Sequence, residues 1–321
     1  MTSGYHGYLK VLGMKKARFL LSLTNDDNDY QIEQASAARQ AALKLGVELE
    51  IVYAKNDGIV QSQQLLNRIQ SSTNPRPDAI LFEPAGSTAL PQVARAAAAA
   101  GMGWVVLNRD ADYMAGLRRE FHVPVFAITS DHEEIGRIQG RQLTALAPGG
   151  GLVLYIQGPS ESSAAQQRLS GTSEAKLGTI QLRVLKAHWT EASAYKAVSS
   201  WLRLSTSRDN QIVAVCAQDD SMAIGARKAF EECFAKQREL WEKTPFLGCD
   251  GLPKTGQEWV RRGMLAATVH IPANAGHAME LMKKSIETGV QPPDRTFTPC
   301  QSIPEIQALQ ERSLRARAGS R

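Results

Sequence analysis

The chain has 321 residues, of which 43% are hydrophobic, and a formal net charge of +5 at pH 7. This length allows two domains of ordinary size, each with its own core. No apolar run approaches the roughly 18 residues of a membrane span, so we expect a chain that is not embedded in a membrane. The mild charge favours no nucleic-acid partner.

The ends of the chain and its cysteines bear on location. Residues 1–16 are predicted to be a leader or disordered, and the first apolar run, "FLLSL", is shorter than the roughly 7–15 residues of a secretory signal. As written, the sequence therefore predicts a cytoplasmic protein; it would be periplasmic if a leader has been removed or the start lies elsewhere. The widely spaced cysteines favour a reducing compartment: Cys216, Cys233, Cys249 and Cys300.

The C-terminal end is rich in arginine. We expect it to be a frayed, solvated tail rather than a nucleic-acid arm. Its basic residues are Arg312, Arg315, Arg317 and Arg321.

Strand-like and helix-like patterns alternate from Arg18 onward. The strand-like runs are "FLLSL", "VELEIVY", "DAILF" and "GWVVL". Between them, helices are predicted over residues 30–45, 60–70 and the segment "STALPQVARAAAAAG", and Gly46 stands where the first helix would end. A βαβ alternation of this kind is typical of a parallel sheet with helices on both faces.

The pattern restarts after a less regular stretch over residues 110–124. The strand-like runs are now "VFAIT", "LVLYI", "LRVLKA", "QIVAVC", "PFLGC" and "LAATV". Helices are predicted over 131–146, 162–177, 191–204, 219–235, 254–262 and 274–288. The sequence therefore predicts an α/β fold of two doubly wound parallel-sheet lobes, with a cleft beyond the carboxyl ends of the strands.

Motifs of common enzymes are not found. A dinucleotide site needs glycines in its first turn, whereas the first turn here is "TNDDNDYQ". The segment "DHEEIGR" contains His132 but lacks the second histidine that a zinc helix needs; it is typical of a helix start capped by Asp131. No catalytic set can be assembled, so we expect a non-catalytic protein without cofactor or metal, and an enzyme with a Rossmann-like fold is the less favoured interpretation.

Polar side chains follow many of the predicted strands, and "VVLNRD" is the clearest case. A single Asp at such a place indicates only a helix cap. Several polar groups from both halves indicate a binding site, because carboxylates, amides and guanidinium groups grip neighbouring hydroxyls and aromatic faces pack on sugar rings. The strand-end residues are Asn28, Tyr30, Asn108, Arg109, Trp189, Asp219, Asp250 and His270, with Arg168 near a helix start.

These segments resemble those of the type I periplasmic binding proteins, specifically the ribose- and galactose-binding branch that shares its core with lactose-repressor-type regulators. The resemblance covers residues 17–300 and rests on "DAILFEPAGSTAL", "VVLNRD", "TSDHEEIGRIQGRQL", "SSAAQQRLSG", "VAVCAQDDSMAIGARKAF", "FLGCDGLP" and "RRGMLAATVHIPANAG". It implies two lobes joined by three crossovers near 129, 270 and 298. The N-terminal lobe would comprise 17–129 and 271–298, and the C-terminal lobe 130–270 and 299–321.

The resemblance also assigns residues to a ligand site. It implies first-turn contacts from Asn28 and Tyr30, an inter-lobe pair of Asn108 and Arg109, a clamp by Arg168 and stacking by Trp189. The remaining polar contacts would come from Asp219, Asp250 and His270. The ribose pattern has Asp, Asn and Gln where this chain has Asn108, Asp219 and His270, and an aromatic residue where it has Gln31. These departures point to another sugar, a sugar alcohol or an amino or cationic derivative.

Alternatives remain for several of these residues. Asp220 is expected to cap the helix "DSMAIGA" rather than contact ligand. Arg109 has an ion pair with Asp110 or Asp131 as its alternative, and Tyr30 and Trp189 have packing in the core. His270 at the hinge would make binding depend on pH between about 5 and 7.5.

The expected function is to trap a small polyhydroxylated ligand by hinge closure, as the receptor of an ABC sugar transporter. The alternative is a cytoplasmic sugar-sensing module that reports to a kinase or transcriptional regulator. The residues before the first strand are too few for a helix-turn-helix headpiece, so direct DNA binding is not expected. The expected partners are the ligand and either an ABC transporter permease or a sensor kinase, and the expected oligomeric state is a monomer.

Overall fold

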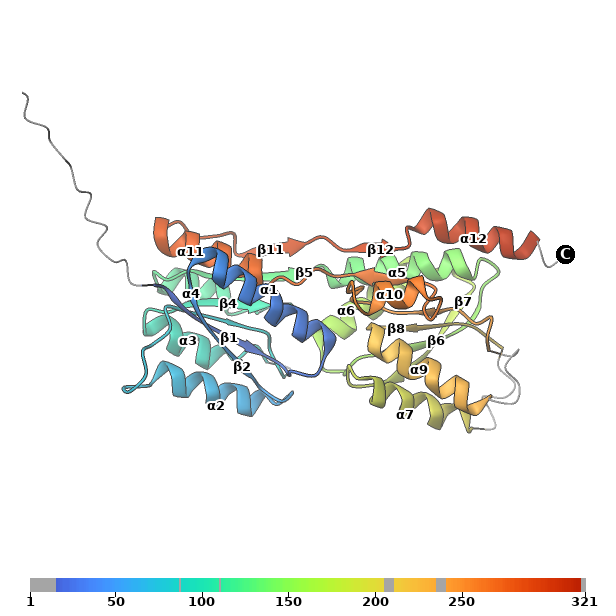
Figure 1. Cartoon of the computed structure of the whole chain (residues 1–321), viewed down its shortest axis with the longest axis horizontal. Coiled ribbons are helices and arrows are strands. Elements are labelled where there is room, and N and C mark those ends of the chain that lie inside the picture. The colour runs from blue at the N-terminus through green and yellow to red at the C-terminus, as the bar shows by residue number, and fades with distance from the viewer. Residues whose placement is uncertain (1–15, 87, 110, 205–210, 235–240, 319–321) are drawn as a thin grey trace, which may run out of the picture.

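The computed structural model describes residues 16–86, 88–109, 111–204, 211–234 and 241–318. These residues form two α/β lobes that lie side by side (Figure 1). The predicted fold class of two doubly wound parallel-sheet lobes is confirmed. The leader expected over 1–16 lies almost wholly outside the described residues.

The N-terminal lobe is built on a six-stranded parallel sheet in the order β11-β5-β4-β3-β1-β2. Its strands are β1 (Arg18–Leu23), β2 (Glu48–Tyr53), β3 (Ala79–Phe82), β4 (Gly103–Leu107), β5 (Val125–Ser130) and β11 (Arg295–Thr298). Its helices are α1 (Asp29–Leu45), α2 (Gly58–Ile69), α3 (Pro91–Ala99), α4 (Met114–Glu120) and α11 (Ala275–Thr288).

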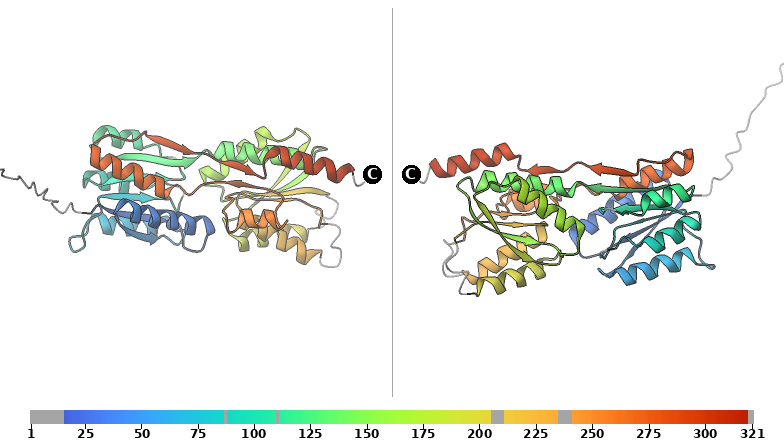
Figure 2. Two further views of the ribbon diagram at one scale, coloured as in Figure 1. Left: turned by 45° about the horizontal axis from the view of Figure 1, so that its top comes forward. Right: turned by 180° about the vertical axis from the view of Figure 1, so that it is seen from behind.

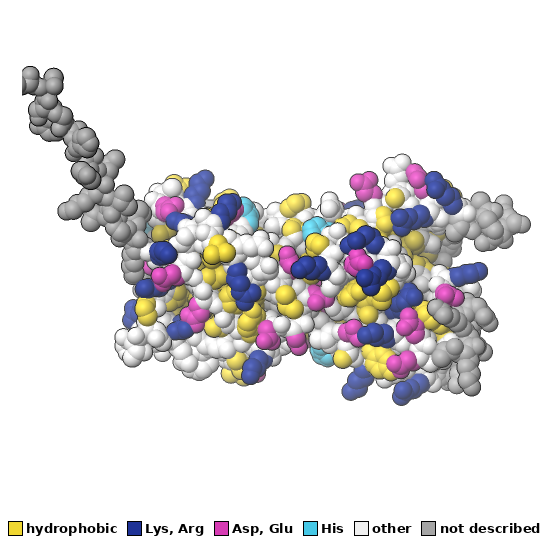
Figure 3. All heavy atoms as spheres, viewed as in Figure 1, with side chains coloured by type: hydrophobic (Ala, Val, Ile, Leu, Met, Phe, Trp, Pro, Cys, Tyr) yellow, Lys and Arg dark blue, Asp and Glu magenta, His cyan; other side chains and the backbone are white. Residues whose placement is uncertain are grey.

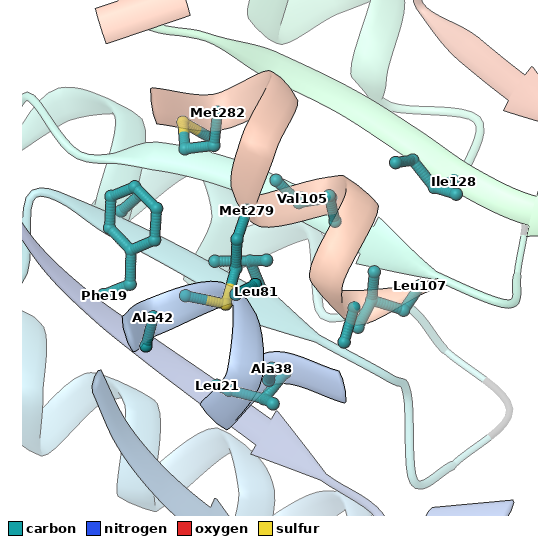
Figure 4. Close-up of a cluster of buried hydrophobic side chains, with 14 of the residues drawn as sticks. Phe19, Leu21, Ala38, Ala42, Leu81, Val105, Leu107, Ile128, Met279 and Met282 are labelled. Carbon is teal, nitrogen blue, oxygen red and sulfur yellow. The ribbon is translucent and has the colours of Figure 1, made fainter. Parts of the chain in front are cut away.

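The central strands of this sheet are apolar on both faces. Phe19 and Leu21 of β1 belong to one buried cluster with α1 and α11, whereas Leu20 belongs to a second cluster with α2, α3 and α4. Figure 4 shows the first cluster, in which Met279 and Met282 of α11 lie against side chains of the sheet. Since successive side chains of a strand point to opposite faces, a continuous apolar run is what a strand covered on both sides requires.

The C-terminal lobe is built on a four-stranded parallel sheet in the order β7-β6-β8-β9. Its strands are β6 (Gly151–Gln157), β7 (Ile180–Lys186), β8 (Ile212–Ala217) and β9 (Phe246–Leu247). Its helices are α5 (His132–Leu146), α6 (Ser163–Ala175), α7 (Glu191–Leu202), α9 (Asp220–Cys233), α10 (Gly256–Arg261) and α12 (Ile306–Ala318). Residues of α7 and α9 form one buried cluster with the sheet, and residues of α5 and α12 form another.

Three connections link the lobes along one edge of the molecule (Figures 1 and 2). The chain passes between the lobes at 130–131, 271–274 and 299–300, and β10 (Thr268–His270) pairs antiparallel with β12 (Gln301–Ile303) beside this edge. The open side opposite this edge is where the lobes face each other. Such an arrangement permits hinge motion about a few connecting residues.

The structure differs from the sequence-based expectation at three elements. A frayed tail was expected at the C-terminus, but α12 extends to Ala318 because Leu309, 1% exposed, anchors it in the α5 cluster. Arg312 and Arg315 are exposed on this helix, while the side chain of Arg317 and all of Arg321 lie outside the described residues. Helix α4 lies in the stretch taken as irregular, and the strand expected at "LAATV" is reduced to the short β10.

The surface carries charges of both signs. On the face shown in Figure 3, basic and acidic side chains lie interspersed over both lobes. No helix among the described residues combines the length and the apolar character that crossing a bilayer requires.

Candidate ligand-binding cleft

A cavity of about 380 Å³ lies between the lobes, where loops that follow the strands of both sheets meet. Its volume is within the range of small-molecule sites. Nearly all of the residues predicted from the sequence line it, and His270 does not. The predicted residues in the lining are Asn28, Tyr30, Asn108, Arg109, Arg168, Trp189, Asp219 and Asp250.

Asn28 and Tyr30 come from the turn between β1 and α1. The Asn28 side chain caps α1 by accepting the backbone N–H groups of Tyr30 at 2.9 Å and Gln31 at 3.3 Å. Its Nδ2 donates across the cleft to the carbonyl of Trp189 at 3.4 Å. Gln31, which replaces an aromatic residue of the ribose pattern, lines the cavity and accepts the backbone N–H of Thr24 at 3.1 Å. Asn28 therefore both starts the helix and joins the two lobes.

Asn108 is the centre of a hydrogen-bond network on the N-terminal side. Its Oδ1 accepts Nδ2 of Asn274 at 2.7 Å and the Tyr30 hydroxyl at 3.4 Å, and its Nδ2 donates to Oε2 of Glu83 at 3.2 Å. The residue is 4% exposed and has φ of 55°, a left-handed conformation that Asn tolerates better than most residues. This network holds the end of β4 in a fixed shape before any ligand arrives.

Arg109 follows Asn108 and reaches into the cavity. Its Nη1 donates to the Asn108 carbonyl at 2.7 Å. Burial lowers the pKa of Arg109, while the Glu83 carboxylate opposes that shift. The alternative ion pair with Asp131 is not found among the described residues, and Asp110 lies outside them. Within the described residues, the Arg109 guanidinium makes this one hydrogen bond, so its remaining donors are open to a ligand there.

Arg168 on α6 is buried at the C-terminal side and is joined to the other lobe through His132. Its Nη1 donates to the Gln218 carbonyl, and its Nε donates to Nδ1 of His132 at 3.4 Å. Nε2 of His132 lies 3.0 Å from the carbonyl of Asn108. Burial, together with Arg168 and Arg109, holds the pKa of His132 well below its usual value. A neutral imidazole that accepts at Nδ1 and donates at Nε2 fits both contacts.

Trp189 lies at the C-terminal wall with φ of 59°. Its ring packs on Gly158, where a Cβ would come within 2.3 Å of the indole, so only glycine fits beneath it. The Arg168 guanidinium lies 5.6 Å from the centre of the ring, within the range of a cation–π contact. The ring is partly buried, lines the cavity and also packs against the core cluster of α7 and α9, so both interpretations of Trp189 apply.

Two adjacent carboxylates at the start of α9 have different roles. Asp219, and not Asp220 as expected, caps the helix, because its Oδ1 accepts the N–H of Met222 at 2.6 Å. Asp220 stays out of the cavity lining and accepts the Thr268 hydroxyl at 2.7 Å and the N–H of Gly251 at 2.8 Å. Burial raises the pKa of Asp219 to about 6 and that of Asp220 to about 8.

Asp250 follows β9 and has φ of 105°, which is unusual for a residue with a side chain. Its backbone N–H donates to Val269 at 2.9 Å and its carbonyl accepts from Ile271 at 2.9 Å, so the main chain is tied to the β10 crossover. Burial raises the pKa of Asp250 well above its usual value, and the nearby Asp219 raises it further. The Asp250 side chain accepts no hydrogen bond from another described residue.

His270 lies behind the cleft rather than in its lining. Its Nδ1 is 2.9 Å from the Gly251 carbonyl, and the ring is thereby held against the turn that carries Asp250. Sequence reasoning missed several buried residues that line the cavity, among them Glu83 and His132. Glu83 follows β3 directly and could have been found by the strand-end rule; His132 was interpreted only as part of a helix start.

The chemistry available in the cleft is recognition by hydrogen bonds and charge. No group of three or more His, Cys, Asp or Glu side chains among the described residues is placed to hold a metal ion. Carboxylates, guanidinium groups, amides and one indole face can together bind a small molecule rich in polar groups.

The comparison with protein families decides the family. Residues 19–287 match the periplasmic binding protein domain. The chain belongs to this family. Its members are non-catalytic binding proteins, so the resemblance inferred from the sequence and the absence of enzymatic function both agree with the match.

Several known proteins are similar. The chain is 27% identical over 256 residues to the ribose import binding protein of Escherichia coli, covering 80% of this chain and 79% of that one. It is 29% identical over 192 residues to a putative rhizopine-binding protein of Rhizobium meliloti, covering 58% of each chain. An ABC transporter solute binding protein of Actinobacillus succinogenes, solved with D-allose, superposes with a TM-score of 0.78 over 92% of this chain and 100% of that one, at 22% identity. The fold of the chain is therefore shared with solute-binding proteins.

Proposed function

We propose that the chain is a solute receptor that traps a monosaccharide or polyol between its lobes by hinge closure. The single observation that carries this proposal is that both lobes present open polar groups to one cavity. Arg109 lies on the N-terminal wall, and Arg168, Asp219 and Asp250 lie on the C-terminal wall. A ligand that contacts both walls binds the closed form better than the open form, and this difference drives closure.

The energetic requirement is modest. Micromolar affinity corresponds to about −8 kcal/mol, and a hydrogen bond to a charged group contributes about 1.5–3 kcal/mol. A few such bonds and one ring stacked on Trp189 meet this requirement after the cost of ordering is subtracted. The cavity volume of about 380 Å³ is enough for a single small ring.

The ligands of similar proteins support the same ligand class. The Escherichia coli relative is named for ribose import, and the similar solved structures include proteins with bound D-allose and with bound myo-inositol. On this basis we further propose that the chain works in the periplasm and delivers its ligand to an ABC transporter permease. This second step rests on the relatives and not on the cleft itself.

A thermal-shift screen tests the binding proposal. The purified chain would be heated with about forty monosaccharides, sugar alcohols, amino sugars and inositols, and a ligand in large excess over its Kd raises Tm by several degrees. The matched variant Asp57→Asn is a control, because Asp57 caps α2 at an exposed site outside the cavity. It should respond to the same compound as the unaltered chain. If no compound raises Tm, the proposal is contradicted.

Fractionation of the native host tests the transport role. Recovery of the chain in the periplasm supports the receptor. Recovery in the cytoplasm would contradict it and would favour the sugar-sensing module that reports to a kinase or regulator.

A further inference from the structure

The cavity has an excess of acidic side chains. Its lining contains the carboxylates of Glu83, Glu161, Asp219 and Asp250, against the guanidinium groups of Arg109 and Arg168. No ion pair joins these carboxylates to either arginine within the described part of the chain. The arginines instead contact the carbonyls of Asn108 and Gln218. The four carboxyl groups of the lining therefore outnumber its two guanidinium groups, and none of the four is directly paired with either of them in the described residues.

Asp219 supplies the observation that points to a ligand. The residue is 3% exposed, and its Oδ1 is occupied by the N–H of Met222. Its Oδ2 is buried and has no hydrogen-bond partner among the described residues, although the residue lines the cavity. A buried carboxylate oxygen without a donor is costly, and a ligand that donates to it removes the cost.

Asp250 presents a second open carboxylate to the same cavity. Burial raises the pKa of Asp250 most, and the charge of the nearby Asp219 raises it further, as expected for two acidic groups at one cavity. A neutral hydroxyl can donate one hydrogen bond to one of these oxygens but leaves the repulsion between the carboxylates in place. An ammonium group donates up to three hydrogen bonds and carries the charge that offsets the repulsion.

We propose that the ligand of this cleft is an amino derivative of a monosaccharide or cyclic polyol, whose ammonium group is bound by Asp219 and Asp250. This inference rests on the proposed function and narrows its ligand class. Arg109 and Arg168 then hold hydroxyl oxygens of the same ligand, and the Trp189 face covers its ring. The ribose pattern has Asn at this position. Asp219 in its place adds a negative charge to the cleft.

Calorimetry on matched pairs of compounds tests the inference. The pairs are glucose with glucosamine, galactose with galactosamine, mannose with mannosamine, and inositol with aminodeoxyinositols; the N-acetylated amines keep the nitrogen but lose its charge. We expect at least one amine to bind at least tenfold more tightly than both its hydroxyl parent and its N-acetyl form. Equal or tighter binding of the hydroxyl parent in every pair would overturn the inference and leave the proposed function standing. Binding by no compound would overturn both.

The variant Asp219→Asn assigns the preference to a residue. Asn is as good a helix cap as Asp, so α9 keeps its start while the charge is removed. We expect the affinity for the preferred amine to fall at least tenfold and that for its hydroxyl parent to change less than threefold. The control Asp57→Asn makes the same change at a cap outside the cavity and should leave both affinities unaltered. An unchanged preference in Asp219→Asn would overturn the inference.

Proton release gives a readout that a structural role would not change. Titrations at pH 6 in two buffers of different ionisation enthalpy report how many protons leave on binding. An ammonium group that binds ionised Asp219 displaces its proton, so we expect release in the unaltered chain and less in Asp219→Asn; no release in either would contradict the inference. The charged or titratable groups that influence Asp219 and Asp250 are Asp29 of α1, Arg168 of α6, Asp220 of α9 and Cys249 of the β9 loop.

Discussion

The two walls of the cleft differ in how far their polar groups are satisfied within the protein. On the N-terminal wall, Asn108 forms hydrogen bonds with Tyr30, Asn274 and Glu83, and this network fixes the positions of the four side chains. On the C-terminal wall, Oδ2 of Asp219 has no hydrogen-bond partner within the described part of the chain, and no described residue donates to the Asp250 side chain. The N-terminal wall is therefore preorganised, and the C-terminal wall has oxygens left for a ligand.

This contrast separates two kinds of substitution. Removing a residue of the N-terminal network should cost stability even without ligand, because buried partners lose their hydrogen bonds. Removing an open carboxylate from the C-terminal wall should cost affinity alone. A substitution of Arg168 should cost both stability and affinity, since Arg168 contacts Gln218 and His132 and also lines the cavity.

The largest effect is expected for Arg168→Ala. Loss of two hydrogen bonds from a charged group to the ligand, each contributing about 1.5–3 kcal/mol, should weaken ligand binding at least about 100-fold. The Tm of the ligand-free chain should also fall by several degrees, because the Gln218 carbonyl and His132 lose a donor. Calorimetry and a thermal melt measure both. A fall in Tm without a change in affinity would mean that Arg168 stabilises the fold but does not bind the ligand.

The comparison of the walls is tested by a pair of variants. Asp250→Ala should weaken binding about tenfold while the ligand-free Tm stays within a degree of the unaltered chain, since its carboxylate has no partner in the protein. Asn108→Ala should lower the ligand-free Tm by several degrees, because three buried contacts are lost. Melting curves of both variants decide. If Asp250→Ala unfolds the chain and Asn108→Ala does not, the proposed difference between the two walls of the cleft is wrong.

The dependence of stability on pH sharpens the account of Asp219. Because burial raises its folded-state pKa to about 6, the folded chain binds a proton more tightly than the unfolded chain, and stability from this group is lost as pH rises toward and through 6. Asp219→Asn has no such loss. Its Tm relative to the unaltered chain should therefore rise by a few degrees between pH 5 and pH 7.5.

His132 acts in the opposite direction over this pH range, because its lowered pKa costs stability as the pH falls. It is present in both chains, so its contribution cancels in the difference between their Tm values, which reports the charge of Asp219 together with its effect on the pKa values of Asp220 and Asp250. If the Tm difference between Asp219→Asn and the unaltered chain stays constant or shrinks as the pH rises, the description of Asp219 as a buried, unpaired carboxylate is wrong.

The smallest effect is expected for His270→Gln. Its ring contacts the Gly251 carbonyl and does not line the cavity, so affinity should change less than threefold and its pH profile between 5 and 7.5 should match that of the unaltered chain. Titration calorimetry at three pH values measures this. A loss of pH dependence in the variant would instead support the role predicted from the sequence, in which His270 at the hinge makes binding depend on pH.

Much of the cleft was predictable from the sequence because its residues follow strands. In a parallel sheet the carboxyl ends of the strands meet at one edge, so "AQDD" and "GCDG" bring Asp219 and Asp250 to one edge of the C-terminal sheet, and "VVLNRD" places Asn108 at the corresponding edge of the N-terminal sheet. The two lobes followed from the alternation of strands and helices. Short elements such as β11 and α12 gave weak signals, since pairing with β5 and burial of Leu309 are what stabilise them.

The parts that could not be predicted depend on the partners of single atoms. Either Asp219 or Asp220 can cap α9, and only the packing of Asp220 against Thr268 and Gly251 decides between them. His132 lies in a segment that is typical of an ordinary helix start, and its contact with Asn108 spans two lobes. A sequence does not show which oxygen of a carboxylate is left open.

A crystal structure of the chain with the best compound from the screen tests the central claim most directly. The account predicts that the ligand lies between the lobes and donates to Oδ2 of Asp219 and to Asp250, with Arg168 on an oxygen at its other side. A ligand bound elsewhere, or one in the cleft that leaves Oδ2 of Asp219 without a donor, would contradict it.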